Sequence, residues 1–294
     1  MSTYDTDKKT VTKDPSYPGA IKRLAMINDL TGFGRCSLAV TIPVVSLMQV
    51  QACPVPTSIL SNHLGFSDYF FQDYTPYMEA YLNGFSKLDI LFDGISCGFL
   101  GNEKQLEIIN KFLQQNLTKG RKPLFILDPV LGDHGKTYST ITHSHCQKMR
   151  ELVQYADILT PNITEACLLT GTTYKEDIFT EKELRHICEK LSHDKDKNIV
   201  ITGLSTKTSI QNFVWESGVS SCLEHPIAGS SRPGTGDLFA AIIAADALNG
   251  VSLISSVKKA ADFISLCIKE SDYHNVPIKE GVLFEACLPS LLEN

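Results

Sequence analysis

The chain has 294 residues, with 27 Lys and Arg against 33 Asp and Glu, and therefore carries a net charge of −6. Because 43% of the residues are hydrophobic and 20% are charged, the composition is that of a globular protein and excludes a chain that is disordered throughout. An acidic chain without a basic run is not expected to bind nucleic acid. The longest apolar run, residues 238–245, is far shorter than the roughly 18 residues of a membrane-spanning helix, so no membrane partner is expected.

The cysteines indicate a reducing environment. There are nine, an odd number, and no two of them have the Cys-x-x-Cys spacing of a zinc site or a redox motif. We therefore expect free thiols and a cytoplasmic protein.

The first segment along the chain is a polar tail. Residues 1–20 lack periodicity and contain two prolines, which predicts disorder. No linker-like stretch and no internal repeat interrupts residues 21–294, so this part is expected to form a single domain.

Within that domain, short apolar runs alternate with helical patterns. Strands are expected over residues 23–28, 88–97, 124–128, 157–160 and 198–202. Helices are expected over residues 37–50, 102–117, 144–153, 164–169 and 181–191. A hairpin over 207–215 and 220–225 is expected at the sheet edge, and the last helices are expected over 237–249, 252–269 and 281–292. This alternation predicts an α/β fold with a mostly parallel sheet.

Polar or turn residues end most of the expected strands. The positions are Asn28, Asp29, Gly98, Asp128, 160–162 and Thr202. In open α/β sheets, ligands bind beyond the carboxyl ends of the strands, so these residues indicate an enzyme.

The most specific motif is Pro233-Gly234-Thr235-Gly236-Asp237, which precedes a helix rich in small residues. The glycines allow a ligand to approach the backbone, and the start of the helix offers free amides to an anion. The alternative is a tight turn followed by Asp237 as an ordinary N-cap.

A second motif places Asn162 and Glu165 three residues apart at a helix start, with the acidic strand end Asp128 earlier in the chain. Their oxygens suit a hydrated Mg²⁺, which takes few protein ligands. The alternatives are a capping box for Asn162 and Glu165, which can coexist with metal binding, and turn chemistry for Asp128. Neither a Gly-x-Gly-x-x-Gly nor a Walker sequence is present.

Taken together, these motifs resemble those of the ribokinase-like superfamily and, within it, of the pyridoxal/pyridoxamine kinases. The resemblance runs from about residue 24 to about residue 288. It rests on the glycine-rich motif at 233–237, on the segments at 128–132 and 161–165, and on Leu60-Ser61-Asn62-His63 and the segment at 96–101. It implies a three-layer α/β/α fold with the sheet between two layers of helices.

The resemblance also implies phosphoryl transfer from MgATP to the 5′-hydroxyl of pyridoxal, pyridoxamine or pyridoxine. The amides of Gly234, Thr235 and Gly236 would stabilise the transferred group, and Asp237 would accept the hydroxyl proton. A carboxylate at a helix N-terminus is favoured in its charged form, so Asp237 is expected to be a weak base. Asp128, Asn162 and Glu165 would hold Mg²⁺ mainly through waters, and the residues expected to line the nucleotide are these three with Thr202, Ser230, Ser231, Arg232 and Pro233.

The ring pocket would be formed by Asp29, His63, Leu64 and Phe99 together with Asp237. Vitamin B6 kinases commonly carry Thr at the position of Leu64 and often Ser at the position of Asp29, so the identity of the ring substrate is open. His63 taken alone is more typical of a hydrogen-bonded structural histidine. A homodimer and a monovalent cation such as K⁺ are further implications of the resemblance.

Two alternatives stay open. A hydroxymethylpyrimidine kinase has a similar substrate, although many carry Cys where this chain has Asp237. A vitamer-binding protein that has lost activity is the other, and the intact motifs argue against it.

Overall fold

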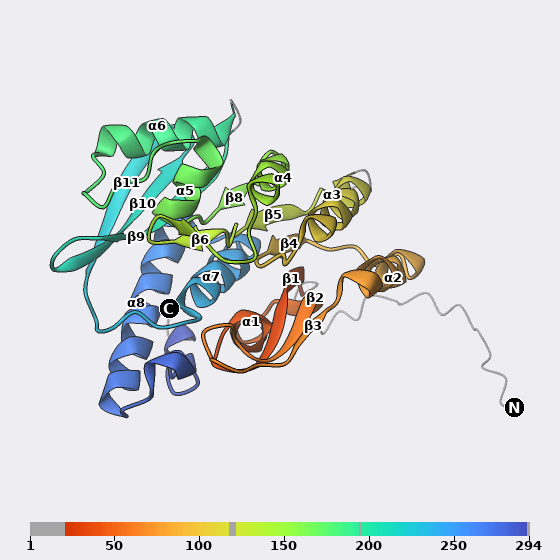
Figure 1. Ribbon diagram of the computed structural model, residues 1–294, viewed down its shortest axis with the longest axis horizontal. Helices are drawn as coiled ribbons and strands as arrows, with labels where there is room; N and C mark the ends of the chain where they lie inside the picture. Colours follow the sequence, from red (N-terminus) through yellow and green to blue (C-terminus); the bar gives the residue numbers. More distant parts are fainter. Residues whose placement is uncertain (1–20, 118–121, 194–195, 293–294) are drawn as a thin grey trace, which may run out of the picture.

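A nine-stranded sheet forms the centre of the molecule, with strand order β11-β10-β9-β8-β5-β4-β1-β2-β3 (Figure 1). The computed structural model describes residues 21–117, 122–193 and 196–292. The strands are β1 Arg23–Phe33, β2 Gln51–Asn62, β3 Phe71–Asp73, β4 Gly94–Cys97, β5 Leu124–Leu127, β8 Ile158–Leu159, β9 Asn198–Ser205, β10 Ser209–Glu216 and β11 Val219–Pro226. A separate small ribbon pairs β6 Gly132–Asp133 with β7 Lys136–Thr137.

The six strands from β9 to β2 run parallel, and β3, β10 and β11 pair antiparallel at the two edges. The predicted hairpin is β10–β11, at one edge of the sheet. Its turn residues Ser217 and Gly218 both have positive φ, 48° and 84°, which matches the right-handed twist of paired strands. The predicted α/β fold with a mostly parallel sheet is confirmed.

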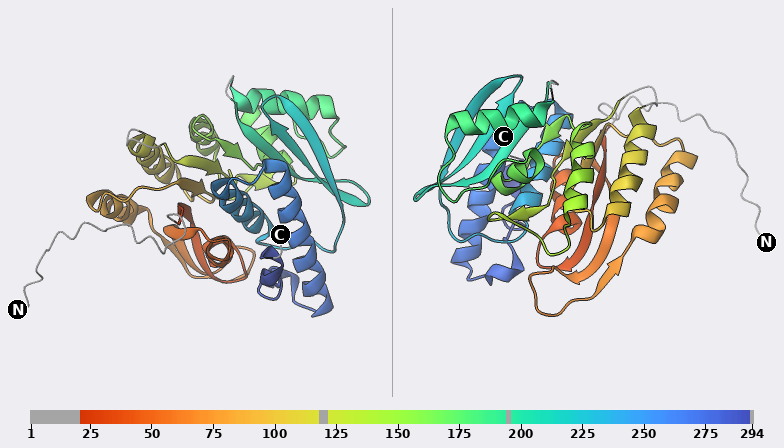
Figure 2. Two further views of the ribbon diagram at one scale, coloured as in Figure 1. Left: turned by 180° about the vertical axis from the view of Figure 1, so that it is seen from behind. Right: turned by 45° about the horizontal axis from the view of Figure 1, so that its top comes forward.

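Helices cover both faces of the sheet, as the three-layer prediction requires. They are α1 Ser37–Leu47, α2 Thr75–Lys87, α3 Glu103–Leu117, α4 His143–Val153, α5 Ile163–Thr170, α6 Glu181–Ser192, α7 Thr235–Asn249 and α8 Leu253–Tyr273. The helices α2 to α6 lie on one face, and α1, α7 and α8 lie on the other (Figure 2).

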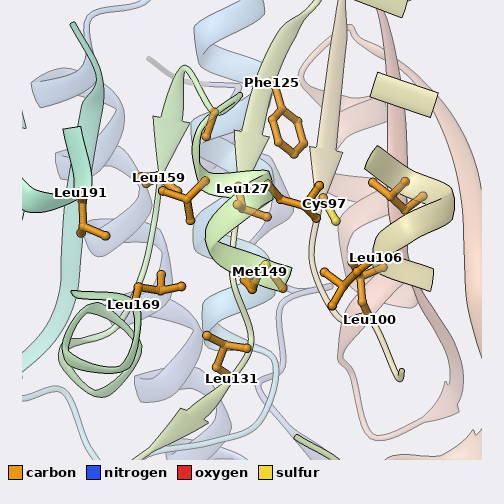
Figure 3. Close-up of a cluster of buried hydrophobic side chains, with 14 of the residues drawn as sticks. Cys97, Leu100, Leu106, Phe125, Leu127, Leu131, Met149, Leu159, Leu169 and Leu191 are labelled. Atoms are coloured by element: carbon orange, nitrogen blue, oxygen red, sulfur yellow. The ribbon is translucent and has the colours of Figure 1, made fainter. Parts of the chain in front are cut away.

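Each face of the sheet has its own apolar core, because successive side chains of a strand point to opposite faces. On β1, Ala25 and Ile27 join the core under α2 to α6, whereas Leu24 and Met26 join the core under α1, α7 and α8. Figure 3 shows part of the first core, where Leu127 and Leu159 of adjacent strands lie near Met149 of α4. These two cores hold the sheet rigid beneath its carboxyl edge.

Several predicted elements are wrong in extent or type. No α-helix forms over 281–292; the segment contains the short 3₁₀ helix Leu288–Leu291 and follows another, Ile278–Glu280. Gly281 has a φ of 78°, which ends helical geometry there, while buried apolar side chains imitate a helical pattern. The strand expected over 88–97 is limited to β4.

No strand was expected over β2 or β3 and no helix over α2, and the start of α7 was placed two residues late. The expected disordered tail over 1–20 lies outside the described residues. Within the part of the chain that the structure describes, no helix is both long and apolar enough to cross a membrane.

Candidate active site

The polar ends of three neighbouring strands meet the start of α7 at one narrow cavity of about 30 Å³. Asn28 of β1, Gly98 after β4 and Asp128 after β5 line it together with Asp237 of α7. The carboxyl ends of parallel strands lie at one edge of a sheet, which is why residues up to 209 positions apart meet there.

Asp237 points away from its own helix toward β1 and α1. Its Oδ2 accepts a hydrogen bond from the backbone N–H of Ser37 at 2.8 Å, and its Oδ1 accepts one from Nδ2 of Asn28 at 3.0 Å. The N-cap of α7 is Gly234, and no side chain caps this helix. The alternative reading of Asp237 as an ordinary N-cap is therefore wrong.

The glycines beside Asp237 have different roles. Gly234 has a φ of 81°, and a Cβ at this position would collide with the carbonyl oxygen of Arg35. Gly236, by contrast, has open space where a Cβ would lie. The hydroxyl of Thr235 donates to the carbonyl oxygen of Arg232 at 3.2 Å and so leaves the amides of the first turn uncapped. Uncapped amides at a helix N-terminus favour binding of an anion.

The pKa of Asp237 is raised to about 6. Burial is the main cause, the charge of Asp29 adds to it, and the hydrogen bonds from Ser37 and Asn28 oppose it. The position at a helix N-terminus alone predicts a low pKa, so burial outweighs the helix dipole here. Asp237 is a stronger proton acceptor than the sequence indicates.

Asp29 is buried beneath this carboxylate and faces protein hydroxyls. Its Oδ1 accepts from Oγ of Ser37, and its Oδ2 accepts from Oγ1 of Thr31, both at 2.6 Å. Burial raises the pKa of Asp29. Because both oxygens are engaged and the residue is only 7% exposed, the geometry does not support a direct contact between Asp29 and a ring substrate. Asp29 instead fixes the position of Ser37 by accepting a hydrogen bond from its hydroxyl, and the N–H of Ser37 donates to Asp237.

Asn162 and Glu165 form a capping box at the start of α5. Oδ1 of Asn162 accepts from the N–H of Glu165, and Oε2 of Glu165 accepts from the N–H of Asn162, both at 2.9 Å. Oε1 of Glu165 accepts from the N–H of Leu131 at 2.9 Å, and Nδ2 of Asn162 donates to the carbonyl of Gly132 at 2.8 Å. The capping-box reading is confirmed, and both residues also fix the loop that follows β5.

Three carboxyl groups, Asp128, Glu165 and Asp237, form a carboxylate cluster at this edge. Burial raises the pKa of Glu165 to about 7, and burial with the charges of Glu165 and Asp237 raises the pKa of Asp128 well above its usual range. Mutual repulsion of this kind is relieved by a cation.

Among the described residues, no group of three or more His, Cys, Asp or Glu side chains is arranged to enclose a metal ion. No backbone amide in the described part of the chain donates to the carboxylate of Asp128, which leaves this group free to bind a cation directly or through water.

His63 holds the loop after β2. Its Nε2 lies 2.7 Å from the carbonyl oxygen of Lys279, and its Nδ1 accepts from the N–H of Gly65 at 3.0 Å. These partners require a neutral ring with its proton on Nε2. The structural reading of His63 therefore agrees with the geometry. Leu64, beside it, is 42% exposed, and the N–H of Phe99 donates to Oδ1 of Asn28 at 2.9 Å.

Of the residues expected to line the nucleotide, Thr202, Ser230, Ser231 and Pro233 lie near the edge of the site, whereas Arg232 lies apart from it. Thr202 lies beside Asn162 in a β-bridge, and Ser230 and Ser231 are exposed. Pro233 is partly buried and connects them to the glycine-rich turn.

Arg232 is 5% exposed and does not face the cavity. Its Nη2 pairs with Oδ1 of Asp272 at 2.8 Å, and its Nη1 donates to the carbonyls of Val276, Pro277 and Gly281 at 2.9–3.3 Å. The guanidinium is thus occupied by the C-terminal segment, so the geometry does not support Arg232 as a nucleotide contact.

Two residues that contact Asp237 were not among those expected to form the site. Asn28 was noticed only as a polar strand end, and Ser37 contributes a backbone amide, which no sequence motif reveals. The signal for Asn28 was its place at the carboxyl end of a central strand.

Comparison with known proteins identifies the family. A family model named phosphomethylpyrimidine kinase matches residues 42–283. A hydroxymethylpyrimidine/phosphomethylpyrimidine kinase from Haemophilus influenzae is 30% identical over 203 residues, which are 66% of this chain and 70% of the relative. A pyridoxal kinase from Arabidopsis thaliana is also 30% identical, over 171 residues, 55% of this chain and 51% of the relative.

Solved structures give the same fold. A Bacteroides thetaiotaomicron protein named as a phosphomethylpyrimidine kinase superposes with a TM-score of 0.89 at 32% identity, over 94% of this chain and 96% of that one. A crystal form of that protein with pyridoxal gives 0.87 at 32% identity, over 92% and 96%. Pyridoxal kinase from Lactobacillus plantarum gives 0.84 at 27% identity, over 94% and 99%. The chain therefore belongs to the phosphomethylpyrimidine kinase family, a family of kinases in the ribokinase-like superfamily whose named relatives include pyridoxal kinases.

Proposed function

We propose that this chain is a pyridoxal kinase, which transfers the γ-phosphoryl group of ATP to the 5′-hydroxyl of pyridoxal, pyridoxamine or pyridoxine. The observation that carries the proposal is Asp237, a carboxylate with a pKa of about 6 beside the uncapped N-terminus of α7. A positioned base of that pKa is mostly deprotonated at neutral pH and can accept a hydroxyl proton. The similar structure that contains pyridoxal supports this substrate class.

The transfer forms one P–O bond, breaks another and moves one proton. The 5′-oxygen of the acceptor attacks the γ-phosphorus, its proton passes to Asp237, and the bond from the γ-phosphorus to the β–γ bridging oxygen breaks to release ADP. The amides at the start of α7, those of Gly234, Thr235 and Gly236, would stabilise the charge on the transferred group, because no side-chain cap competes with an anion for them.

When bound with ATP, Mg²⁺ would neutralise the negative charge of the phosphates. The residues that would hold it are Asp128 directly or through water, with Asn162 and Glu165 fixing the loop around it. Assembly as a homodimer, a K⁺ requirement and a cytoplasmic location rest on the resemblance and on composition, and they stay proposals.

A second candidate is hydroxymethylpyrimidine kinase, because the matching family model and the Haemophilus influenzae relative carry that name. Its substrate is also a heteroaromatic alcohol, so the same catalytic groups would serve. The Asp at position 237 favours the vitamin B6 substrates over it.

One assay decides between them. The purified protein is given MgATP with pyridoxal, pyridoxamine, pyridoxine or hydroxymethylpyrimidine, and ADP release and the phosphorylated product are both measured. We expect kcat/KM to be highest for a B6 vitamer. A clear preference for hydroxymethylpyrimidine would assign the second function, and no acceptor-dependent ADP release with any of the four would contradict both.

A further inference from the structure

We propose that Asn28 is a positioning residue for the phosphoryl transfer: its side-chain amide joins Asp237 to the backbone of Phe99, so that the base and the loop after β4 are held as one unit. The inference rests on the proposed function, because it assigns Asp237 as the base.

The orientation of the Asn28 amide follows from its partners. Its Oδ1 accepts from two backbone N–H groups, that of Asp29 at 3.0 Å and that of Phe99 at 2.9 Å. A backbone N–H can only donate, so the oxygen must be on that side and Nδ2 must face Oδ1 of Asp237, at 3.0 Å. The three contacts therefore leave no choice between the two flipped forms of the amide.

The space around Asn28 is as specific as its hydrogen bonds. The residue is 8% exposed, and a Cβ on Gly98 would lie 2.7 Å from its Nδ2. Gly98 precedes Phe99, so the absence of a side chain there is what lets the chain after β4 approach β1 closely enough for the contact. The amide thus links three elements, β1, the loop after β4 and α7.

Asn28 differs from the other donor to Asp237. The second donor is the backbone N–H of Ser37, which no substitution except proline removes. Asn28 is the donor that a side-chain change can delete, and a hydrogen bond to a carboxylate favours its charged form. Loss of that donor should make Asp237 easier to protonate and leave its Oδ1 free to turn.

Other ionisable groups act on the same carboxylate. Asp29 lies on β1, Asp128 follows β5, and Cys36 precedes α1; Tyr138 also senses the charge of Asp237. In the part of the chain that the structure describes, none of them donates a hydrogen bond to Asp237, so the effect of the Asn28 amide can be separated from theirs.

The first test is Asn28→Asp. A carboxylate keeps an oxygen toward the N–H groups of Asp29 and Phe99 but replaces the donor to Asp237 with an acceptor. We expect the acid limb of the pH profile of kcat/KM to move upward by about one pH unit or more, since the lost hydrogen bond and the new neighbouring carboxylate both favour the protonated form of Asp237. We also expect kcat to fall about tenfold or more at every pH, because the base is misplaced.

The matched control is Asn116→Asp. Asn116 is also a buried asparagine, on α3, and among the described residues its Nδ2 donates to the carbonyl of Phe112 alone. The same chemical change there should alter stability but not the acid limb. If Asn28→Asp behaves like this control, with reduced stability and an unmoved limb, Asn28 is a structural residue and the proposal is overturned.

A second measurement needs no folded variant of Asn28. In the unmodified protein, the side-chain ¹H–¹⁵N resonances of Asn28 should shift with pH around 6, following Asp237, and in Asp237→Asn that shift should disappear. Resonances that do not titrate, or that titrate equally in Asp237→Asn, would overturn the proposal. This readout does not depend on catalysis, so an inactive protein with titrating resonances would refute the proposed function and leave the Asn28 contact standing.

Discussion

The backbone N–H of Ser37 and the carboxylate of Asp237 are joined by a 2.8 Å hydrogen bond, although 200 residues separate them. The turn before α1 is shaped for this contact, because Gly34, Arg35 and Ser37 all have positive φ, at 114°, 50° and 54°. Such angles in a residue with a side chain cost about 1 kcal/mol or more. The backbone strain is therefore located in the turn that directs the N–H of Ser37 at the carboxylate of Asp237.

Asp237→Asn tests the catalytic role directly. Asn keeps the size and an oxygen for the Ser37 amide but cannot accept the hydroxyl proton. We expect kcat to fall about 10²–10⁴-fold, the typical contribution of a positioned base, with KM for ATP within a few-fold. The free energy of unfolding should fall by only about 1 kcal/mol, because the new amide faces the Nδ2 donor of Asn28. In the unmodified enzyme, kcat/KM should rise as pH increases through about 6, since the base works when deprotonated. Turnover within threefold of the parent would remove Asp237 from catalysis.

The carboxylate cluster should make the protein itself sensitive to pH. The pKa values of Asp128, Glu165 and Asp237 are all raised on folding, the latter two to about 7 and about 6, so the folded state binds protons more tightly than the unfolded state. Their contribution is favourable while all are protonated and is lost as pH rises from about 4 to above 7.

Urea unfolding in the absence of nucleotide should therefore show a free energy of unfolding that contains a component falling between pH 5 and pH 8. Asp128→Asn removes one titrating group and should flatten that fall. A variant with the same slope as the parent would contradict the assignment of the pH dependence to this cluster.

The variants Glu165→Gln and Asp128→Asn distinguish the helix-capping role of Glu165 from the metal-binding role proposed for Asp128. Gln presents one oxygen and one amide where Glu165 accepts from two backbone N–H groups, so we expect the free energy of unfolding to fall by about 1–2 kcal/mol. Asp128→Asn should instead raise the Mg²⁺ concentration for half-maximal rate without that loss. Titration of Mg²⁺ in the kinase assay, with urea unfolding on both variants, makes the comparison. An Mg²⁺ dependence unchanged in Asp128→Asn would refute its metal role.

Arg232→Gln distinguishes a structural arginine from a nucleotide contact. The guanidinium has four partners in the C-terminal segment, and Asp272 is half exposed, so the free energy of unfolding should fall by about 3 kcal/mol, the lower end for a buried pair. KM for ATP should stay within twofold. The exposed neighbour Ser231→Ala serves as the control for stability. A KM for ATP raised tenfold in a stable Arg232→Gln protein would restore the nucleotide role.

The sequence predicted the site best where local chemistry and topology agree. The strand ends at Asn28 and Asp128 and the glycine-rich turn before Asp237 follow from periodicity and from the rule for parallel sheets, and the structure brings them together. The pKa of Asp237 was misjudged because the helix dipole is a local property, whereas burial depends on residues far away in the chain.

The same distinction explains Arg232 and the last predicted helix. An arginine beside a glycine-rich turn resembles a phosphate ligand until its partners 40 to 49 residues later are known. Residues 281–292 have apolar side chains at spacings that suit a helix, but these side chains pack as an irregular segment onto α1 and α8. Tertiary contacts determine both the role of Arg232 and the conformation of residues 281–292, and such contacts cannot be read from a local sequence pattern.

The segment 276–285 holds residues around the site through three contacts. The carbonyl of Val276 accepts a hydrogen bond from Arg232, and the carbonyl of Lys279 lies against Nε2 of His63. Glu285 forms an ion pair with Arg35 at 2.9 Å. These contacts join parts of the chain that lie 44 to 250 residues apart. Pairing between such distant parts of a chain is slow. We therefore expect these contacts to form late in folding, so that the site becomes rigid only once residues 276–285 have docked.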